Sequence, residues 1–290
     1  MRLLRSVLAL AVLGAAGAWI LSAPPRPDPD LATLTGDAEA GALVFAAAGC
    51  ASCHIAPEAE PGGVPVLSGG KAFATDFGTF YAPNISPSPD GIGGWTDAQI
   101  IHAVQAGVSP DGRYYYPAFP THAYALAETR DIADLVAHLR TLPVDATPTR
   151  PHDVGFPFSI RRSLWGWRLL FAPKDWIVDV EGPELERGRY LVEALGHCGE
   201  CHTPRNALGG LKSDAWLTGA PLPTGKGRVP GITPGILGWS KTEIANYLES
   251  GFTPEFDVAG GEMVDVIANT SQLTDADRAA IAAYLVALPE

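Results

Sequence analysis

The sequence predicts an all-α protein built as a tandem pair of similar domains, and three observations lead to this prediction. The pattern C-x-x-C-H occurs twice, at residues 50–54 and 198–202. Glycine and tryptophan residues recur around both patterns at nearly the same intervals. Each copy also ends in an amphipathic helical pattern that stops at a proline. A chain of 290 residues has the length expected for about two domains.

The repeated pattern is the one that attaches haem covalently. Two thiols one helical turn apart can bond both vinyl groups of a haem, and the adjacent histidine can coordinate its iron. The two patterns contain every cysteine of the chain: Cys50, Cys53, Cys198 and Cys201. We therefore expect two haem c groups on these cysteines, with His54 and His202 as axial ligands of the irons.

Two other uses of paired cysteines fit less well. The halves of a four-cysteine zinc site normally lie within tens of residues of each other, whereas Cys50 and Cys198 are far apart in the chain. A thiol redox pair would be expected in a βαβ setting, and no such pattern surrounds either motif. Both motifs are also followed directly by a histidine, which favours haem.

The charge balance excludes one class of partner. The formal net charge is −12, so no basic patch is expected that could neutralise the phosphates of a nucleic acid. An acidic surface instead favours docking onto a basic patch of a redox partner protein, in an association that salt weakens.

Residues 1–30 are expected to form a targeting segment. Arg2 and Arg5 precede an apolar run that ends at Leu21, and a proline-rich linker follows. This run is compatible with a cleaved signal peptide and equally with an uncleaved membrane anchor that has Trp19 near the outer interface. Both alternatives export the chain. We therefore expect a periplasmic protein that is soluble or anchored to the inner membrane.

The two copies correspond beyond their cysteines. Each has a helical pattern before the haem motif, a middle helix that opens after a tryptophan and closes at a glycine, and a last helix that ends at a proline. Corresponding positions are Gly41 and Gly188, Gly49 and Gly196, Trp95 and Trp239, Gly107 and Gly251, and Pro143 and Pro289. We therefore expect domain 1 at residues 31–146 and domain 2 at residues 183–290, each wrapped around one haem.

Four further stretches carry a resemblance to a known family: Tyr81 to Ser86, Gly91 to Thr96, Gly196 to Asn206, and Gly260 to Met263. With both haem motifs, they make residues 37–290 resemble a diheme class I cytochrome c, similar to the cytochrome c subunit of membrane-bound alcohol and sugar dehydrogenases. The resemblance implies a class I cytochrome c fold around each haem and a role in electron transfer. Those subunits usually carry three haems, whereas this chain has two attachment motifs.

Class I cytochromes c usually place a methionine sulfur opposite the histidine. Met263 is the only methionine besides Met1, and it lies in the expected loop before the last helix. We therefore expect Met263 to be the second axial ligand of haem 2. In the second copy, Met263 follows Gly251 at a fixed interval. The same interval counted from the corresponding Gly107 in the first copy ends at Phe119, where the dehydrogenase subunits carry methionine. Phenylalanine offers iron no lone pair.

Three arrangements are compatible with haem 1. Its iron has no sixth ligand or only a weak one, with Phe119 packed over that face; His122 in the same loop is the ligand; or His102 or a tyrosine takes that role. No motif assigns the remaining histidines to iron: His138, His152 and His197.

The segment between the two copies, residues 147–182, is too apolar for a solvated linker. We expect a structured strap that packs across both domains and fixes their geometry; a docking surface for a partner is the alternative. Arg161, Arg162 and Arg168 either pair with haem propionates or flank this strap.

These observations together predict an electron-transfer cytochrome. It would pass single electrons between a dehydrogenase or quinol-oxidising complex and a terminal oxidase or soluble carrier. No nucleotide-binding fingerprint and no nucleophile constellation suggest a separate catalytic residue. The alternative is a diheme redox enzyme, similar to a peroxidase or a sulfur-compound oxidase, that acts at an open haem 1. A redox or gas sensor would use the same vacancy, but no output domain accompanies it.

Overall fold

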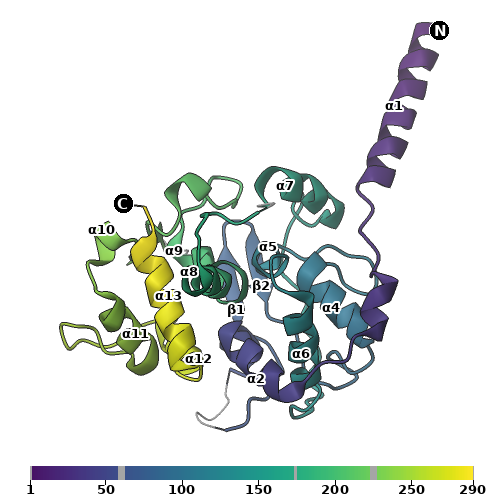
Figure 1. Ribbon diagram of the computed structural model, residues 1–290. Coiled ribbons are helices and arrows are strands. Elements are labelled where there is room, and N and C mark those ends of the chain that lie inside the picture. Colours follow the sequence, from purple (N-terminus) through teal and green to yellow (C-terminus); the bar gives the residue numbers. More distant parts are fainter. Residues whose placement is uncertain (1, 58–62, 173–174, 223–226, 290) are drawn as a thin grey trace.

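Helices form nearly half of the chain and are its main regular structure, as predicted, and they follow one another in a similar order in both halves. The computed structural model describes residues 2–57, 63–172, 175–222 and 227–289. The first half contains α2 (Ala38–Ala47), α3 (Cys50–His54), α4 (Asp97–Ala106), α5 (Thr121–Tyr124) and α6 (Thr129–Leu139). The second half contains α8 (Pro183–Arg189), the π-helical η3 (Tyr190–Leu195), α9 (Gly199–His202), α10 (Pro234–Leu237), α11 (Lys241–Ser250), α12 (Met263–Thr270) and α13 (Asp275–Ala287). Figure 1 shows α4 and α6 on one side of the molecule and α11 and α13 on the other.

The first and last helices of each half cross at a glycine. A methyl group on Gly41 would lie 1.9 Å from the carbonyl oxygen of Asp134, so α2 and α6 approach backbone to backbone. The crossing of α8 and α13 is equivalent, because a methyl group on Gly188 would lie 2.0 Å from the carbonyl oxygen of Ala280. Any larger residue would force these helices apart, which explains why glycine recurs at this position of the repeat.

The two middle helices begin and end in the same way. Thr96 and Ser240 each form a capping box with the third helical residue, Gln99 in α4 and Glu243 in α11. Both helices end at a glycine in the left-handed conformation, which residues with a side chain rarely adopt. The predicted bounds of these helices are therefore confirmed.

Two short hairpins were not predicted. Strands β1 (Ala72–Thr75) and β2 (Gly78–Tyr81) pair antiparallel, as do β3 (Ala220–Pro221) and β4 (Arg228–Val229). The all-α prediction is therefore correct for the helical framework and incomplete for the loops after the haem motifs. These strands are too short for an alternating pattern to stand out from the surrounding loop sequence.

The halves share one hydrophobic core. A single cluster of buried apolar side chains includes Ile101 and Ile132 from the first half and Leu195 and Tyr284 from the second, each 1% exposed or less. Polar contacts join the halves as well. The Tyr190 hydroxyl donates to Asp131 Oδ2 at 2.6 Å and accepts from a backbone N–H of the first half. The relative position of the halves is thus fixed by burial and by hydrogen bonds.

Residues 147–182 contact both halves. They contain η2 (Arg161–Ser163) and α7 (Leu164–Phe171). Trp167 Nε1 donates to Leu208 O in the second half at 2.7 Å, and an Arg168 N–H donates to Ala106 O in the first half at 2.7 Å. Near the end of this segment, the backbone N–H groups of Ile177 and Val178 donate hydrogen bonds to the Glu193 carboxylate of the second half.

Three of the four arginines of this segment, Arg161, Arg162 and Arg168, are those that the sequence analysis considered for haem propionates, and all three contact protein groups. Arg161 donates to Tyr114 O and stacks on the Tyr116 ring. Arg162 stacks on Trp19, and Arg168 lies over the Tyr114 ring. Of the two roles that the sequence allowed, the structure thus favours flanking the interdomain segment over pairing with haem propionates.

The N-terminal helix α1 (Arg2–Leu21) projects from the rest of the molecule (Figure 1). None of its residues is buried, and it is long and apolar enough to cross a bilayer. A proline-rich segment and the 3-10 helix η1 (Pro29–Thr33) connect it to α2. The last short element, η4 (Ser213–Ala215), precedes Trp216.

Candidate haem sites

The first motif forms the one-turn helix α3, which begins after Gly49 in the left-handed conformation. Cys50 and Cys53 are therefore one turn apart. His54 follows on the same helix, and its Nδ1 lies 2.8 Å from the carbonyl oxygen of Pro83. A carbonyl can only accept, so Nδ1 carries the proton and Nε2 keeps a free lone pair. The ring is thus held in the tautomer that can ligate iron.

The second motif repeats this geometry. Cys198 precedes α9, which contains Cys201 and His202, and His202 Nδ1 lies 2.8 Å from the carbonyl oxygen of Pro230. The sequence analysis missed both proline acceptors. A signal was present, since each proline follows its histidine at nearly the same separation, 29 residues in the first half and 28 in the second.

The four thiols suit thioether formation better than zinc binding. All four cysteines are free, and burial raises the pKa of the Cys50 and Cys198 thiols to about 12. Among the described residues, no group of three or more His, Cys, Asp or Glu side chains could hold a metal ion. The donors present therefore fit two separate haems, each with a cysteine pair and one oriented histidine.

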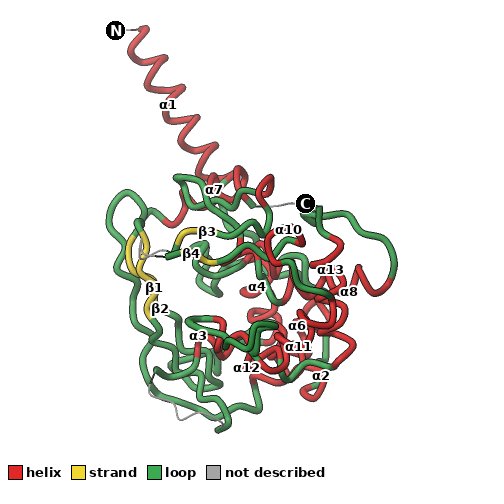
Figure 2. Tube along the Cα trace, turned by 90° about the vertical axis from the view of Figure 1, so that its left-hand side faces the viewer, coloured by secondary structure: helices red, strands yellow, loops and turns green. Residues whose placement is uncertain are grey.

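The two motifs face the interface between the halves. Helix α12 of the second half packs against α2 and α3 of the first, and Asn269 Nδ2 donates to Ser52 Oγ at 2.7 Å. Figure 2 shows α3 and α12 side by side. The reverse contact also exists, because α5 of the first half packs against η3, which precedes the second motif. There the Tyr124 ring lies edge-on to His197, with centroids 5.6 Å apart.

Met263 is the first residue of α12 and is half-buried. The residue before it, Glu262, forms an ion pair with Lys71 of the first half at 2.5 Å. Lys71 also donates to Ser52 O inside the first haem motif, at 3.0 Å. Met263 thus lies at the start of a short helix rather than in the expected loop, and this helix start is held by the other half of the chain.

Phe119 lies between two tyrosines in the corresponding loop of the first half. Its ring centroid is 5.6 Å from that of Tyr115 and 5.4 Å from that of Tyr124. Tyr124 is buried and donates to Ala48 O, just before the first motif. These aromatic contacts give Phe119 a packed position beside the haem 1 motif.

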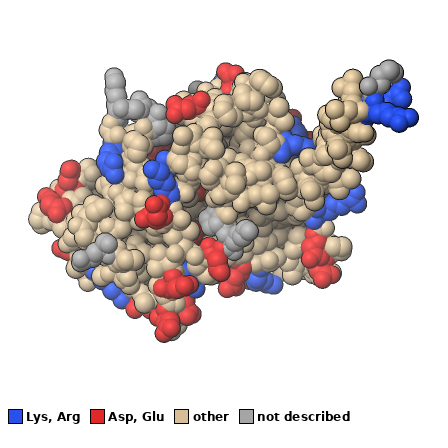
Figure 3. Space-filling model, turned by 90° about the horizontal axis from the view of Figure 1, so that it is seen from above, with Lys and Arg blue, Asp and Glu red and all other residues tan. Residues whose placement is uncertain are grey.

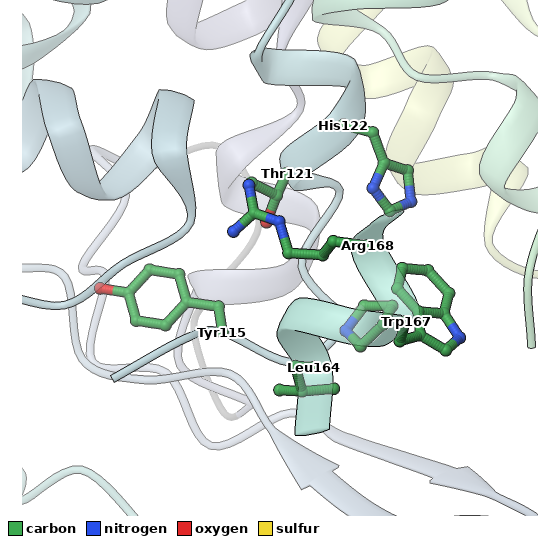
Figure 4. Close-up of a pocket in the computed structure, with 7 residues that line it drawn as sticks. Tyr115, Thr121, His122, Leu164, Trp167 and Arg168 are labelled. Atoms are coloured by element: carbon green, nitrogen blue, oxygen red, sulfur yellow. The ribbon is translucent and has the colours of Figure 1, made fainter. Parts of the chain in front are cut away.

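His122 is buried and stacks on the Trp167 ring, with centroids 5.4 Å apart. Burial lowers its pKa, so the imidazole is neutral. It lines a small pocket together with Tyr115, Thr121 and Arg168, shown in Figure 4.

The other histidines have contacts that explain them without iron. His102 Nε2 lies 3.1 Å from Pro25 O, and His197 Nε2 lies 3.3 Å from Ala48 O. His138 packs against Phe45, and His152 Nδ1 accepts from the Tyr81 N–H at 3.1 Å.

Comparison with known proteins decides the family. The family model for cytochrome c matches residues 38–143. A diheme c-type cytochrome of Cereibacter sphaeroides is 56% identical over 292 residues, which cover 99% of this chain and 98% of that protein. The chain belongs to the c-type cytochromes.

Other members of this family are subunits of dehydrogenases. The cytochrome subunit of fructose dehydrogenase from Gluconobacter japonicus is 38% identical over 303 residues, covering 100% of this chain and 60% of that protein. The cytochrome c subunit of a quinone-dependent alcohol dehydrogenase from Gluconobacter oxydans is 35% identical, over 86% of this chain and 54% of that protein. The predicted cofactors are thus confirmed: this c-type cytochrome carries two covalently bound haem c groups.

Proposed function

We propose that the chain is a periplasmic electron carrier with two c-type cytochrome domains, at residues 31–146 and 183–290, joined by a structured strap at residues 147–182. The single observation that carries this proposal is that both haem-attachment motifs lie at the interface between the halves, where α12 contacts the first motif through the bond from Asn269 to Ser52 and α5 packs against η3 before the second motif. Electron tunnelling weakens steeply with distance, so attachment sites at a shared interface favour transfer between them. When bound, each haem supplies reversible one-electron chemistry.

The residues that would hold the two haems follow from the geometry. Cys50 and Cys53 would hold haem 1 and Cys198 and Cys201 haem 2, while His54 and His202 would ligate their irons. The bonds from these histidines to Pro83 O and Pro230 O support this assignment, because they orient Nε2 as a ligand and raise its basicity.

We assign Met263 as the second axial ligand of haem 2. Its place at the start of α12, its partial burial and the ion pair of the preceding Glu262 all support a held ligand rather than a loose surface side chain. A thioether ligand raises the reduction potential, so haem 2 would be the centre with the higher potential.

For haem 1 we propose a site with no sixth ligand or only a weak one. The packing of Phe119 between Tyr115 and Tyr124 supports this arrangement, since it fills the methionine position with a ring that has no donor atom. The stacking of His122 on Trp167 argues against its recruitment, because the imidazole would have to leave that contact to reach iron.

A dehydrogenase is the proposed electron donor. Relatives with 35–38% identity carry the names of cytochrome subunits of fructose and alcohol dehydrogenases, which supports a partner of this class. A quinol-oxidising complex is the alternative donor, and a terminal oxidase or soluble carrier would accept the electrons. The charge of −12 fits docking onto basic surfaces of such partners.

We further propose that α1 is retained as a tether to the inner membrane. The folded structure supports a retained helix because it holds the residues that follow it: Ser22 is buried, and Ala23 O accepts a hydrogen bond from the Tyr114 hydroxyl. These contacts bind the end of α1 to the folded body.

One observation favours a second candidate function, a redox enzyme that acts at haem 1. The pocket in Figure 4 is lined by the polar side chains of Thr121 and His122, which follow Phe119 closely in the chain. Polar groups beside an open haem face can assist the reaction of a bound small molecule. Turnover of peroxide or thiosulfate by the purified protein would favour this candidate.

The electron-carrier proposal is tested by mixing the oxidised protein with the catalytic subunits of fructose or alcohol dehydrogenase that lack their own cytochrome subunit. With the sugar or alcohol substrate present, we expect the absorption bands of both haems to change to those of the reduced form. A protein that no dehydrogenase reduces, but that consumes peroxide or thiosulfate catalytically, would overturn the proposal.

A further inference from the structure

The end of α1 is fixed to the body by contacts with the strap. The Arg162 guanidinium stacks on the Trp19 ring at 3.7 Å and donates to Trp19 O and Ser22 Oγ. Pro25 O, a few residues on, is bound by His102 of α4. The direction in which α1 leaves the body is therefore set by at least two separate elements.

Beside this point, α7 presents apolar side chains to the outside. Leu169 is 56% exposed and Leu170 is 73% exposed, and Ile160, just before η2, is 49% exposed. Figures 1 and 2 both show α7 at the foot of α1. Seen from above in Figure 3, a broad area of uncharged side chains lies next to the base of α1, with basic groups at its edge.

The opposite side of α7 is anchored, so these leucines cannot turn inward. Leu164 is buried, Trp167 donates to Leu208 O, and Arg168 donates to Ala106 O. Exposing two neighbouring leucines to water on a fixed helix is unfavourable, because apolar surface gains free energy when it leaves water. Because α7 is held with Leu169 and Leu170 facing outward, this side of the helix is suited to contact with an apolar medium.

We propose that α7 and Ile160 form a lipid-contacting face that lies in the headgroup region of the membrane that α1 crosses. This inference rests on the tether proposed above. A body bound directly to the last turn of α1 sits at the bilayer surface, so its neighbouring apolar face meets lipid without any further rearrangement. The pairing of Trp19 with Arg162 fits the same depth, because tryptophan favours the interface and arginine extends its charge toward the headgroups.

This arrangement has a consequence for electron transfer. The bilayer would contact the body at α1 and at α7 together, which fixes its orientation rather than leaving it to swing on one helix. Helix α12 lies in the part of the body away from α1 and α7 in Figures 1 and 2, and Figure 2 shows α3, which contains the haem 1 motif, beside it. That part would then face the periplasm and its redox partners.

The test uses the full chain with both haems, in vesicles of phosphatidylethanolamine and phosphatidylglycerol. All native cysteines are committed to haem, so Leu170→Cys provides a single free thiol for a photoreactive diazirine label. Ala268→Cys, exposed on α12, is the matched control. We expect lipid adducts after illumination from the label at position 170, at a yield at least tenfold above that from position 268.

A further set of substitutions checks that the apolar side chains of α7 are the cause of the lipid labelling. In a chain labelled at Ile160→Cys, the double substitution Leu169→Glu and Leu170→Glu should lower the lipid adduct yield several-fold. Equal lipid yields at positions 170 and 268 would overturn the inference. So would a cross-linked dimer from position 170, since a second copy would then cover the face. An intact mass that lacks the N-terminal segment containing α1 would also overturn the inference. A redox titration of the same sample reports separately on the electron-carrier proposal.

Discussion

Lys71 Nζ lies 2.5 Å from Glu262 Oε2, and Glu262 directly precedes Met263. Lys71 belongs to the first half of the chain and Met263 to the second. The same ammonium group contacts Ser52 O in the first haem motif and Asp265 in α12. The Lys71 side chain thus links the attachment motif of haem 1 to the start of α12, where Met263 would ligate haem 2.

We expect Lys71→Ala to loosen the start of α12 at Met263 and to lower the reduction potential of haem 2, because a weaker thioether bond stabilises the reduced iron less. The pair is partly exposed, so its coupling in a double-mutant cycle with Glu262→Ala should be only about 0.5 kcal/mol. Lys241→Ala breaks the exposed pair with Glu184 and is the control. Equal potentials in Lys71→Ala and Lys241→Ala would contradict the proposed link.

Glycine substitutions test the helix crossings. Gly41→Ala and Gly188→Ala place a methyl group against a backbone carbonyl, so each should lower the free energy of unfolding by about 1–3 kcal/mol. Gly166→Ala in α7 meets no atom within 4 Å and should be neutral or stabilising, by up to about 1 kcal/mol. Chemical denaturation of the haem-loaded proteins measures all three. Equal changes in the free energy of unfolding at the three positions would show that close helix packing at Gly41 and Gly188 is not the cause of the destabilisation.

Glu193 is expected to hold the strap on the second half. Its two carboxylate oxygens accept hydrogen bonds from the Ile177 and Val178 N–H groups and from the Tyr284 hydroxyl. In Glu193→Gln, an amide N–H₂ group replaces one of these oxygens and faces at least one donor, so a hydrogen bond is lost. The loss should be about 1–3 kcal/mol in the free energy of unfolding. The control is Glu181→Gln at an exposed position of the strap.

The same residue predicts a pH dependence. Burial raises the pKa of Glu193 above its usual 4.5, so the folded chain holds this proton more tightly than the unfolded chain. The contribution of Glu193 to stability should therefore fall as pH rises from about 4.5 through the folded pKa. Denaturation curves across this range should show a smaller decline in Glu193→Gln than in the wild type; parallel declines would refute the assignment.

Partner binding should depend strongly on salt. With a net charge of −12, association with a basic redox partner is accelerated at low ionic strength and screened at high ionic strength. We expect the second-order rate of reduction by a dehydrogenase to fall at least about tenfold between low and physiological salt. Stopped-flow absorption measures this rate, and a rate independent of salt would point to an apolar docking surface instead.

The sequence alone predicted those features for which chemistry or local geometry allows only one kind of residue. Cysteine spacing identified both haem motifs, and the recurrence of Gly41 and Gly188 reflects a helix crossing that admits no side chain. Thr96 and Ser240 marked helix starts because capping acts within a few residues. These features are local or are repeated within the chain, so a single sequence reveals them.

Long-range pairings were harder to predict. The bonds from His54 to Pro83 O and from Asn269 to Ser52 join residues that are 29 and 217 positions apart, and no propensity predicts such partners. The short strand Ala72–Thr75 exists because its hairpin partner is adjacent, and its sequence carries no clear alternation. How the two halves pack depends on complementary surfaces, which a pattern of spacings does not describe.

The central claim is that two unequal haems share one interface, with a His/Met pair at haem 2 alone. A redox titration followed by EPR, on the wild type and on Met263→Leu, tests it most directly. We predict two centres of different potential in the wild type. The substitution should lower the higher potential and remove its low-spin signal, while the other centre keeps its signal and its ability to bind CO. Two equivalent low-spin centres that do not bind CO and do not respond to Met263→Leu would contradict the account.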